Sequence, residues 1–205
     1  MGKVKSRENP ILDNYIRIRE ELINEGYREE NSFISILKAN LLAFLTAGPF
    51  AVLFIFIYGF IWKGFYVEIT SPYGLIVVWV FLLLSIPVHE FLHGFTWQFF
   101  CKEGWKSIKF GILWSKLTPY CHCKEPLIVK KYLIALLMPF LVLGIIPGIL
   151  SIILESPFML LFSIFNILGA GGDTTIALKL FKYRKDKNTL ILDHPTECGF
   201  VAFKK

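Results

Sequence analysis

The segment His89-Glu90-Phe91-Leu92-His93 carries the residue types of a hydrolytic metal site. Two histidines four residues apart lie on one face of a helix, about one turn of ~5.4 Å along it. Both imidazoles can therefore reach a single metal ion, and Glu90 beside them can act as a general base towards a water molecule. We expect His89 and His93 to bind zinc, with Glu90 as the catalytic residue.

A third zinc ligand is needed, because a catalytic zinc takes three protein ligands and keeps one position open. The apolar segments of the chain contain two acidic residues, Glu90 and Asp173. Ionisable side chains at membrane depth are costly, so they mark functional sites. Asp173 is therefore the predicted third ligand. Helix packing or pairing with Lys179 is the alternative role for this carboxylate.

The composition indicates a membrane protein. The chain has 205 residues, of which 55% are hydrophobic and 19% charged, and its mean hydropathy is +0.56. A soluble domain of this length rarely has several long uncharged runs. The net charge of +6 does not indicate a nucleic-acid partner, because the basic residues cluster beside the apolar segments.

Four segments are long enough to cross ~30 Å of hydrocarbon, which predicts an all-α membrane protein with four transmembrane helices. The predicted order is a cytoplasmic N-terminal segment (1–38), a metalloprotease core (39–181) and a cytoplasmic C-terminal tail (182–205). The four predicted spans are 39–62, 73–100, 132–154 and 157–181.

The basic residues predict the orientation of these spans. Seven Lys and Arg residues precede the first span and seven lie between spans two and three, whereas the other two connections contain one and none. The positive-inside rule then places both termini and the loop 101–131 in the cytoplasm, in a multi-pass protein of the cytoplasmic membrane. All four cysteines lie outside the spans on that side, so we expect reduced thiols; they are Cys101, Cys121, Cys123 and Cys198.

The predicted topology brings the candidate ligands to one depth. His89 lies sixteen residues after Tyr73, and Asp173 lies sixteen residues after Pro157. Both residues therefore lie ~24 Å along their helices at ~1.5 Å per residue. Because spans two and four run in the same direction, the two residues reach the same depth. Small residues let membrane helices approach closely, and three glycines lie just before Asp173: Gly169, Gly171 and Gly172.

Two elements are predicted outside the spans. An amphipathic helix begins at Pro10, with Asn9 as its cap, and ends near Gly26; we interpret it as a surface helix at the membrane interface. Its apolar face comprises Ile11, Tyr15, Ile18 and Leu22. Alternating residues in 108–114, followed by 117–123, predict a β-hairpin in the cytoplasmic loop. This hairpin would either hold an extended substrate along its edge or only plug the helix bundle.

The remaining polar residues have weaker patterns. His122 lies between Cys121 and Cys123, but a second metal site would need a further ligand, so a structural loop is favoured. Residues 193–195, Asp-His-Pro, are predicted to form a turn. Asn166 lies two turns before Asp173 on the same predicted helix and could bind the substrate backbone or oxyanion. Pro87 lies just before the motif; it would kink its helix and open a path for water.

The motif helix together with Gly171-Gly172-Asp173 resembles the site-2 proteases, which are intramembrane metalloproteases. From span one to the segment Asp193–Phe200, the chain is similar to the small bacterial "putative zincin peptidase" proteins. The site-2 protease resemblance implies zinc held by His89, His93 and Asp173, with Glu90 as the base. The chain differs from that family in lacking its Asn-Pro pattern around the aspartate.

These observations predict a zinc-dependent intramembrane endopeptidase that cleaves a protein or peptide substrate in or near the bilayer. Two alternatives remain open: a metal-binding membrane transport protein, and a non-catalytic relative that acts as a chaperone or immunity factor. The intact motif and the absence of an inverted repeat in the sequence favour the peptidase.

Overall fold

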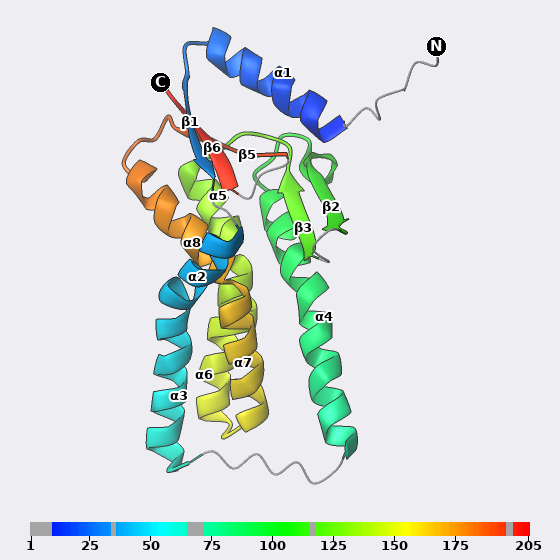
Figure 1. Cartoon of the computed structure of the whole chain (residues 1–205), viewed down its shortest axis with the longest axis vertical. Helices are drawn as coiled ribbons and strands as arrows, with labels where there is room; N and C mark the ends of the chain where they lie inside the picture. Colours follow the sequence, from blue (N-terminus) through cyan, green and yellow to red (C-terminus); the bar gives the residue numbers. More distant parts are fainter. Residues whose placement is uncertain (1–9, 34–35, 65–71, 115–117, 196–198) are drawn as a thin grey trace.

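The computed structural model describes residues 10–33, 36–64, 72–114, 118–195 and 199–205, and it is mostly helical (Figure 1). The helices are α1 (Pro10–Asn24), α2 (Ile36–Thr46), α3 (Gly48–Trp62), α4 (Pro72–Trp97), α5 (Val129–Leu136), α6 (Ile146–Ile153), α7 (Pro157–Gly169) and α8 (Gly171–Leu180), with a π-helical stretch, η2 (Phe140–Ile145), and two 3-10 turns, η1 (Gly104–Ser107) and η3 (Phe181–Tyr183). The strands are β1 (Arg28–Phe33), β2 (Ile108–Leu113), β3 (Thr118–Cys123), β4 (Leu127–Ile128), β5 (Leu190–Asp193) and β6 (Gly199–Lys204).

A four-stranded antiparallel sheet, in the order β1-β6-β5-β4, joins both ends of the chain. In it Arg28 is opposite Lys204, and Leu127 is opposite Ile191. The mostly helical character agrees with the predicted fold class, but an all-α fold did not include this sheet. Strand β1 is hard to recognise in the sequence, because it reads Arg-Glu-Glu-Asn-Ser-Phe and is poor in the β-branched and aromatic residues typical of strands.

Helix α1 packs its apolar face on this sheet. Tyr15, Ile18 and Leu22 are buried against Val201 and Phe203. The helix and its three buried residues agree with the prediction, but the structure covers this face with the sheet and not with a membrane interface. Gly26 ends the helix at φ +88°, and the amides of residues 26 and 27 bond to the carbonyls of residues 23 and 22, as in a Schellman cap. The predicted cap Asn9 lies outside the described residues.

Two helices are long and apolar enough to cross a membrane, namely Ile76–Trp97 and the continuous Val129–Ile153 that joins α5, η2 and α6. A third crossing is made if α7 and the helix Gly171–Tyr183, which meet at a bend of 48°, form one span. The described part of the chain therefore has two to three helices that are long and apolar enough to be spans, which is consistent with a membrane protein and does not confirm four.

The predicted first span, 39–62, is divided in the structure. Helix α2 ends at Thr46 and α3 begins at Gly48, with Pro49 in its first turn. Proline has no N–H for the helical ladder and clashes with the preceding turn, so this sequence favours a break. The 15 residues of α3 span ~22 Å at ~1.5 Å per residue, which is shorter than the hydrocarbon core.

The break before α8 permits a close helix contact. A Cβ added at Gly171 would overlap Ala43 of α2, lying 2.7 Å from its Cα atom. This is the close approach that the glycines predicted for this region. Gly169 and Gly172 have no such neighbour within 4 Å, so Gly171 alone of the three carries it.

The polar elements gather at one end of the helix bundle. Figure 1 shows α1, both sheets and the C-terminus at this end, whereas α3 ends and α4 begins at the other, next to the connection from α6 to α7. The arrangement agrees with the segregation of basic residues in the sequence. That this end faces the cytoplasm stays a prediction.

Candidate metal centre

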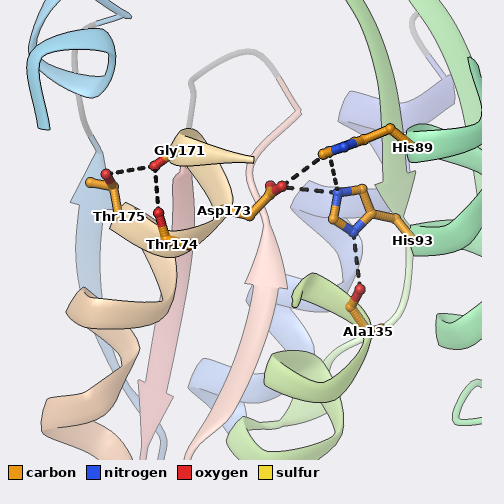
Figure 2. Close-up of polar contacts among 7 residues, drawn as sticks. All are labelled: His89, His93, Ala135, Gly171, Asp173, Thr174 and Thr175. Atoms are coloured by element: carbon orange, nitrogen blue, oxygen red, sulfur yellow. Dashed lines mark hydrogen bonds and ion pairs between the residues drawn. The ribbon is translucent and has the colours of Figure 1, made fainter. Parts of the chain in front are cut away.

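Three potential metal ligands from α4 and α8 converge in the structure (Figure 2). The His89 Nε2 atom lies 3.0 Å from Asp173 Oδ2, and the His93 Nε2 atom lies 3.5 Å from Asp173 Oδ1. The two Nε2 atoms are 3.2 Å apart. One ligand atom from each residue lies within 4.8 Å of the others. Among the residues described, no other three His, Cys, Asp or Glu side chains come together in this way. The sequence predicted this set.

His93 is held in the orientation that a metal ligand needs. Its Nδ1 atom lies 3.0 Å from the carbonyl oxygen of Ala135 in α5. When Nδ1–H donates to that carbonyl, the Nε2 lone pair is directed towards Asp173 and His89. The ring of Trp97 stacks on the imidazole with centroids 5.4 Å apart. His93 is 5% exposed, so its orientation is fixed by packing as well as by the hydrogen bond.

Asp173 lies in the first turn of α8, immediately after the break at Ala170. The hydroxyl groups of Thr174 and Thr175 donate to the Gly171 carbonyl, at 3.0 and 2.8 Å (Figure 2). Thr46 of α2 also contacts the Thr174 hydroxyl at 2.7 Å. The start of α8 is thus anchored to α2, and a carboxylate is favoured at a helix N-terminus.

The donor set fits zinc. Two imidazole nitrogens and one carboxylate oxygen match a three-ligand catalytic zinc site, with a position left for water or substrate. His89 and Asp173 keep side-chain exposures of 14% and 16%, so the centre is neither sealed nor open to bulk solvent. The hydrogen bond between His93 Nδ1 and the Ala135 carbonyl is the kind of contact that usually orients a histidine ligand.

Glu90 belongs to α4 but not to the converging group. The backbone of Cys121 in β3 hydrogen-bonds the Glu90 carboxylate. Adjacent helical residues point ~100° apart, which separates Glu90 from the face shared by His89 and His93. The carboxylate therefore lies beside the ligands and next to the hairpin, where it can meet a water molecule at the centre.

A protein family described as "Putative zincin peptidase" matches residues 82–187, just over half of the chain. The chain belongs to this family. The matched region begins within α4 and contains the motif, the hairpin and α5 to α8, so it includes all three converging ligands. No curated protein and no solved structure matches the chain.

Within the family region, the predicted hairpin is present as β2 and β3, and it packs on the metal-binding helix. The strands are antiparallel, with Ile108 opposite Cys123. Gly94, the residue after His93, makes the contact: a Cβ there would lie 2.5 Å from Phe110 Cζ and 2.8 Å from Ile108 Cγ2. Sequence reasoning missed this role, although a glycine directly after the motif was its visible sign.

The outer edge of β3 is already engaged beside the centre. The Cys121 amide bonds to Glu90, and the Cys123 amide donates to Asp193 Oδ2 at 2.8 Å. These two amides are therefore not open to an extended substrate in this structure. Whether the hairpin holds substrate elsewhere along its edges or only closes the bundle stays a prediction.

The cysteines beside the hairpin are free thiols. The Sγ atoms of Cys101 and Cys123 lie 3.5 Å apart. The hydrogen bond to Cys123 lowers the pKa of the Cys101 thiol, whereas burial raises the pKa of Cys121. Burial also lowers the pKa of His122, whose Nδ1 atom is 3.8 Å from Asp193 Oδ2. These residues pack the hairpin onto its neighbours. The predicted thiol Cys198 lies outside the described residues.

The structure corrects two expectations for polar residues. Asn166 and Asp173 do not share one helix, because α7 ends at Gly169; the Asn166 amide donates to the Phe162 carbonyl of its own helix at 2.9 Å. Asp193 is not in the predicted turn but is the last residue of β5, and it is buried; the chain turns after it. Pro87 lies inside the continuous α4, and its effect on water access stays a prediction.

Proposed function

We propose that the protein is a zinc-dependent intramembrane endopeptidase. The observation that carries this proposal is the convergence of His89, His93 and Asp173 beside Glu90, on helices apolar enough to lie in a bilayer. Membership of a family described as zincin peptidases supports a metallopeptidase, and the position of the centre on α4 supports a substrate within or close to the membrane.

Zinc bound by the three ligands would supply a Lewis acid to the centre. The Glu90 carboxylate accepts a proton from the attacking water and passes it to the nitrogen of the leaving amine. The Ala135 carbonyl holds the proton on His93 Nδ1 throughout, so the imidazole stays oriented. The Cys121 amide restrains the Glu90 carboxylate on the side facing the hairpin.

The Glu90→Gln variant tests the chemistry separately from metal binding. Glutamine keeps the shape of the side chain but cannot accept the proton, so zinc should be retained and hydrolysis lost. A suitable probe is a synthetic peptide of about 20 apolar residues, labelled at both ends and reconstituted with the protein in liposomes. The matched control is Glu155→Gln, at the connection between α6 and α7, which should cleave as the wild type does.

Each outcome separates the peptidase from its alternatives. A Glu90→Gln protein that cleaves the peptide at the wild-type rate would show that Glu90 is not the base. Zinc-loaded wild-type protein that cleaves nothing, but moves zinc into the liposomes, would indicate a transport protein. Zinc binding with neither activity would favour the non-catalytic alternative.

A further inference from the structure

Asp193 is a buried carboxylate outside the metal centre and outside the matched family region. It is 8% exposed at the end of β5. Its Oδ2 atom accepts the Cys123 amide at 2.8 Å, and its Oδ1 atom accepts the Tyr132 hydroxyl. Burying a charged group is expensive unless it is hydrogen-bonded, and bonds to a carboxylate are stronger than neutral ones. Asp193 therefore joins β5, β3 and α5 firmly at one point.

The first branch of this network leads to a metal ligand. Tyr132 lies in α5, one turn before Ala135, whose carbonyl accepts the His93 Nδ1–H. The Tyr132 ring packs on Trp97 with centroids 5.3 Å apart, and Trp97 stacks on His93. Tyr132 therefore contacts the ring that stacks on His93 and lies one helical turn from the carbonyl that holds His93 Nδ1, and its own hydroxyl is fixed by Asp193.

The second branch leads to the catalytic base. Cys123 lies two residues after Cys121 in β3, and alternate residues of a strand direct their amides to the same side. The Cys123 amide points to Asp193, and the Cys121 amide points to Glu90. Fixing one end of this strand edge therefore fixes the direction of the amide that restrains Glu90.

We propose that Asp193 is a positioning residue that sets the geometry of the metal ligand His93 through Tyr132 and of the base Glu90 through β3. The proposal rests on the proposed function for the part that concerns Glu90. The part that concerns His93 needs only a metal at the centre. A residue that only anchored the sheet would affect folding stability and leave the metal geometry unchanged.

The test compares three full-length variants in detergent: Asp193→Asn, Tyr132→Phe and the control Asp186→Asn. Asparagine has one acceptor oxygen in place of two, so one branch must lose its bond. Tyr132→Phe removes only the branch to His93. Asp186 also accepts hydrogen bonds just before β5, from the Asn188 amide at 2.9 Å and the Thr189 hydroxyl at 2.6 Å, but it has no contact with either branch.

Three measurements apply to each variant: zinc retention against a chelator, the visible absorption of the cobalt-substituted protein, and kcat and KM with the liposome peptide. Asp193→Asn should retain zinc about 10- to 100-fold more weakly, shift the cobalt absorption and lower kcat with KM unchanged. Tyr132→Phe should shift the cobalt absorption in the same direction, with a smaller loss of kcat. Asp186→Asn should match the wild type throughout.

Wild-type zinc retention and cobalt absorption in Asp193→Asn would overturn the proposal, even if the variant melts at a lower temperature. If that variant does not fold, an unchanged cobalt spectrum in Tyr132→Phe would overturn it equally. If the wild type cleaves nothing but both variants alter the metal spectrum, the positioning of His93 stands and the peptidase proposal fails.

Discussion

Replacing Gly94 by alanine tests the contact between the metal-binding helix and the hairpin. The new Cβ would lie 2.5 Å from Phe110 Cζ, 2.8 Å from Ile108 Cγ2 and 3.1 Å from Cys121 Sγ. The Phe110 ring is 42% exposed and can swing aside, whereas Ile108 is 8% exposed and has little room. An ordinary contact of at least ~3.4 Å therefore requires the hairpin to move by about 0.6 Å at Ile108, and by about 0.9 Å where the Phe110 ring keeps its position.

Two opposing terms set the stability change. Alanine gains about 1 kcal/mol over glycine in a helix interior, and overpacking a well-packed contact costs about 1–3 kcal/mol. The expected net effect is a loss of up to about 2 kcal/mol, or a fall in Tm of up to roughly 8 °C for a chain of this size. The same displacement moves the Cys121 amide away from Glu90, and a misplacement of ~1 Å can cost about 100-fold in rate.

The assay measures the Tm, the zinc content and hydrolysis of the liposome peptide for Gly94→Ala. The control is Gly169→Ala, at the end of α7, where an added Cβ meets nothing within 4 Å. We expect Gly94→Ala to keep its zinc, because no ligand is changed, and to lose hydrolysis. A Gly94→Ala protein that is more stable than the wild type and fully active would refute the packing argument.

Three further predictions concern the ligands, acid stability and topology. The double variant of His89 and His93 to alanine should lose most of its zinc by elemental analysis, whereas Asp173→Ala should lose less because two imidazoles remain; stoichiometric zinc in the double variant would place the metal elsewhere. Ion pairs with lysines 182 and 204 hold the pKa of Glu30 at about 2, below its ordinary 4.5, so its contribution is full above pH ~4.5 and is lost as the pH falls towards 2. Because the side chain is 40% exposed, Glu30→Gln should cost at most about 1 kcal/mol at neutral pH and should flatten the acid limb of the stability curve; an unchanged curve would exclude the ion pairs. A reporter fused after Lys205 should be cytoplasmic in cells, and an external signal would reverse the predicted orientation.

The features that could be predicted from the sequence are local. Helical periodicity placed His89 and His93 on one face, and the apolar segments around them indicated a membrane protein. Alternation of side chains predicted the β2–β3 hairpin, and Gly26 marked the end of α1. Each of these follows from the period of one element or the backbone freedom of one residue, so neighbouring residues carry the whole signal.

Asp173 is an intermediate case. Its selection depended on the rarity of acidic residues in apolar segments and on counting residues along two predicted helices. The structure brings it to both histidines, although the helix that was expected to carry it is broken at Ala170. The break did not displace the carboxylate from the centre, because the contact of Gly171 with α2 holds the first turn of α8.

The tertiary structure alone decided the remaining supports of the site. The four-stranded sheet pairs Arg28 with Lys204, and the Ala135 carbonyl meets His93 from a different helix. Asp193 joins a strand of that sheet to β3 and α5. These partners lie tens to more than a hundred residues apart in the chain, and a polar strand or a single carbonyl has no periodic pattern. Their pairing depends on which surfaces remain to be buried once all the elements pack, and no local segment carries that information.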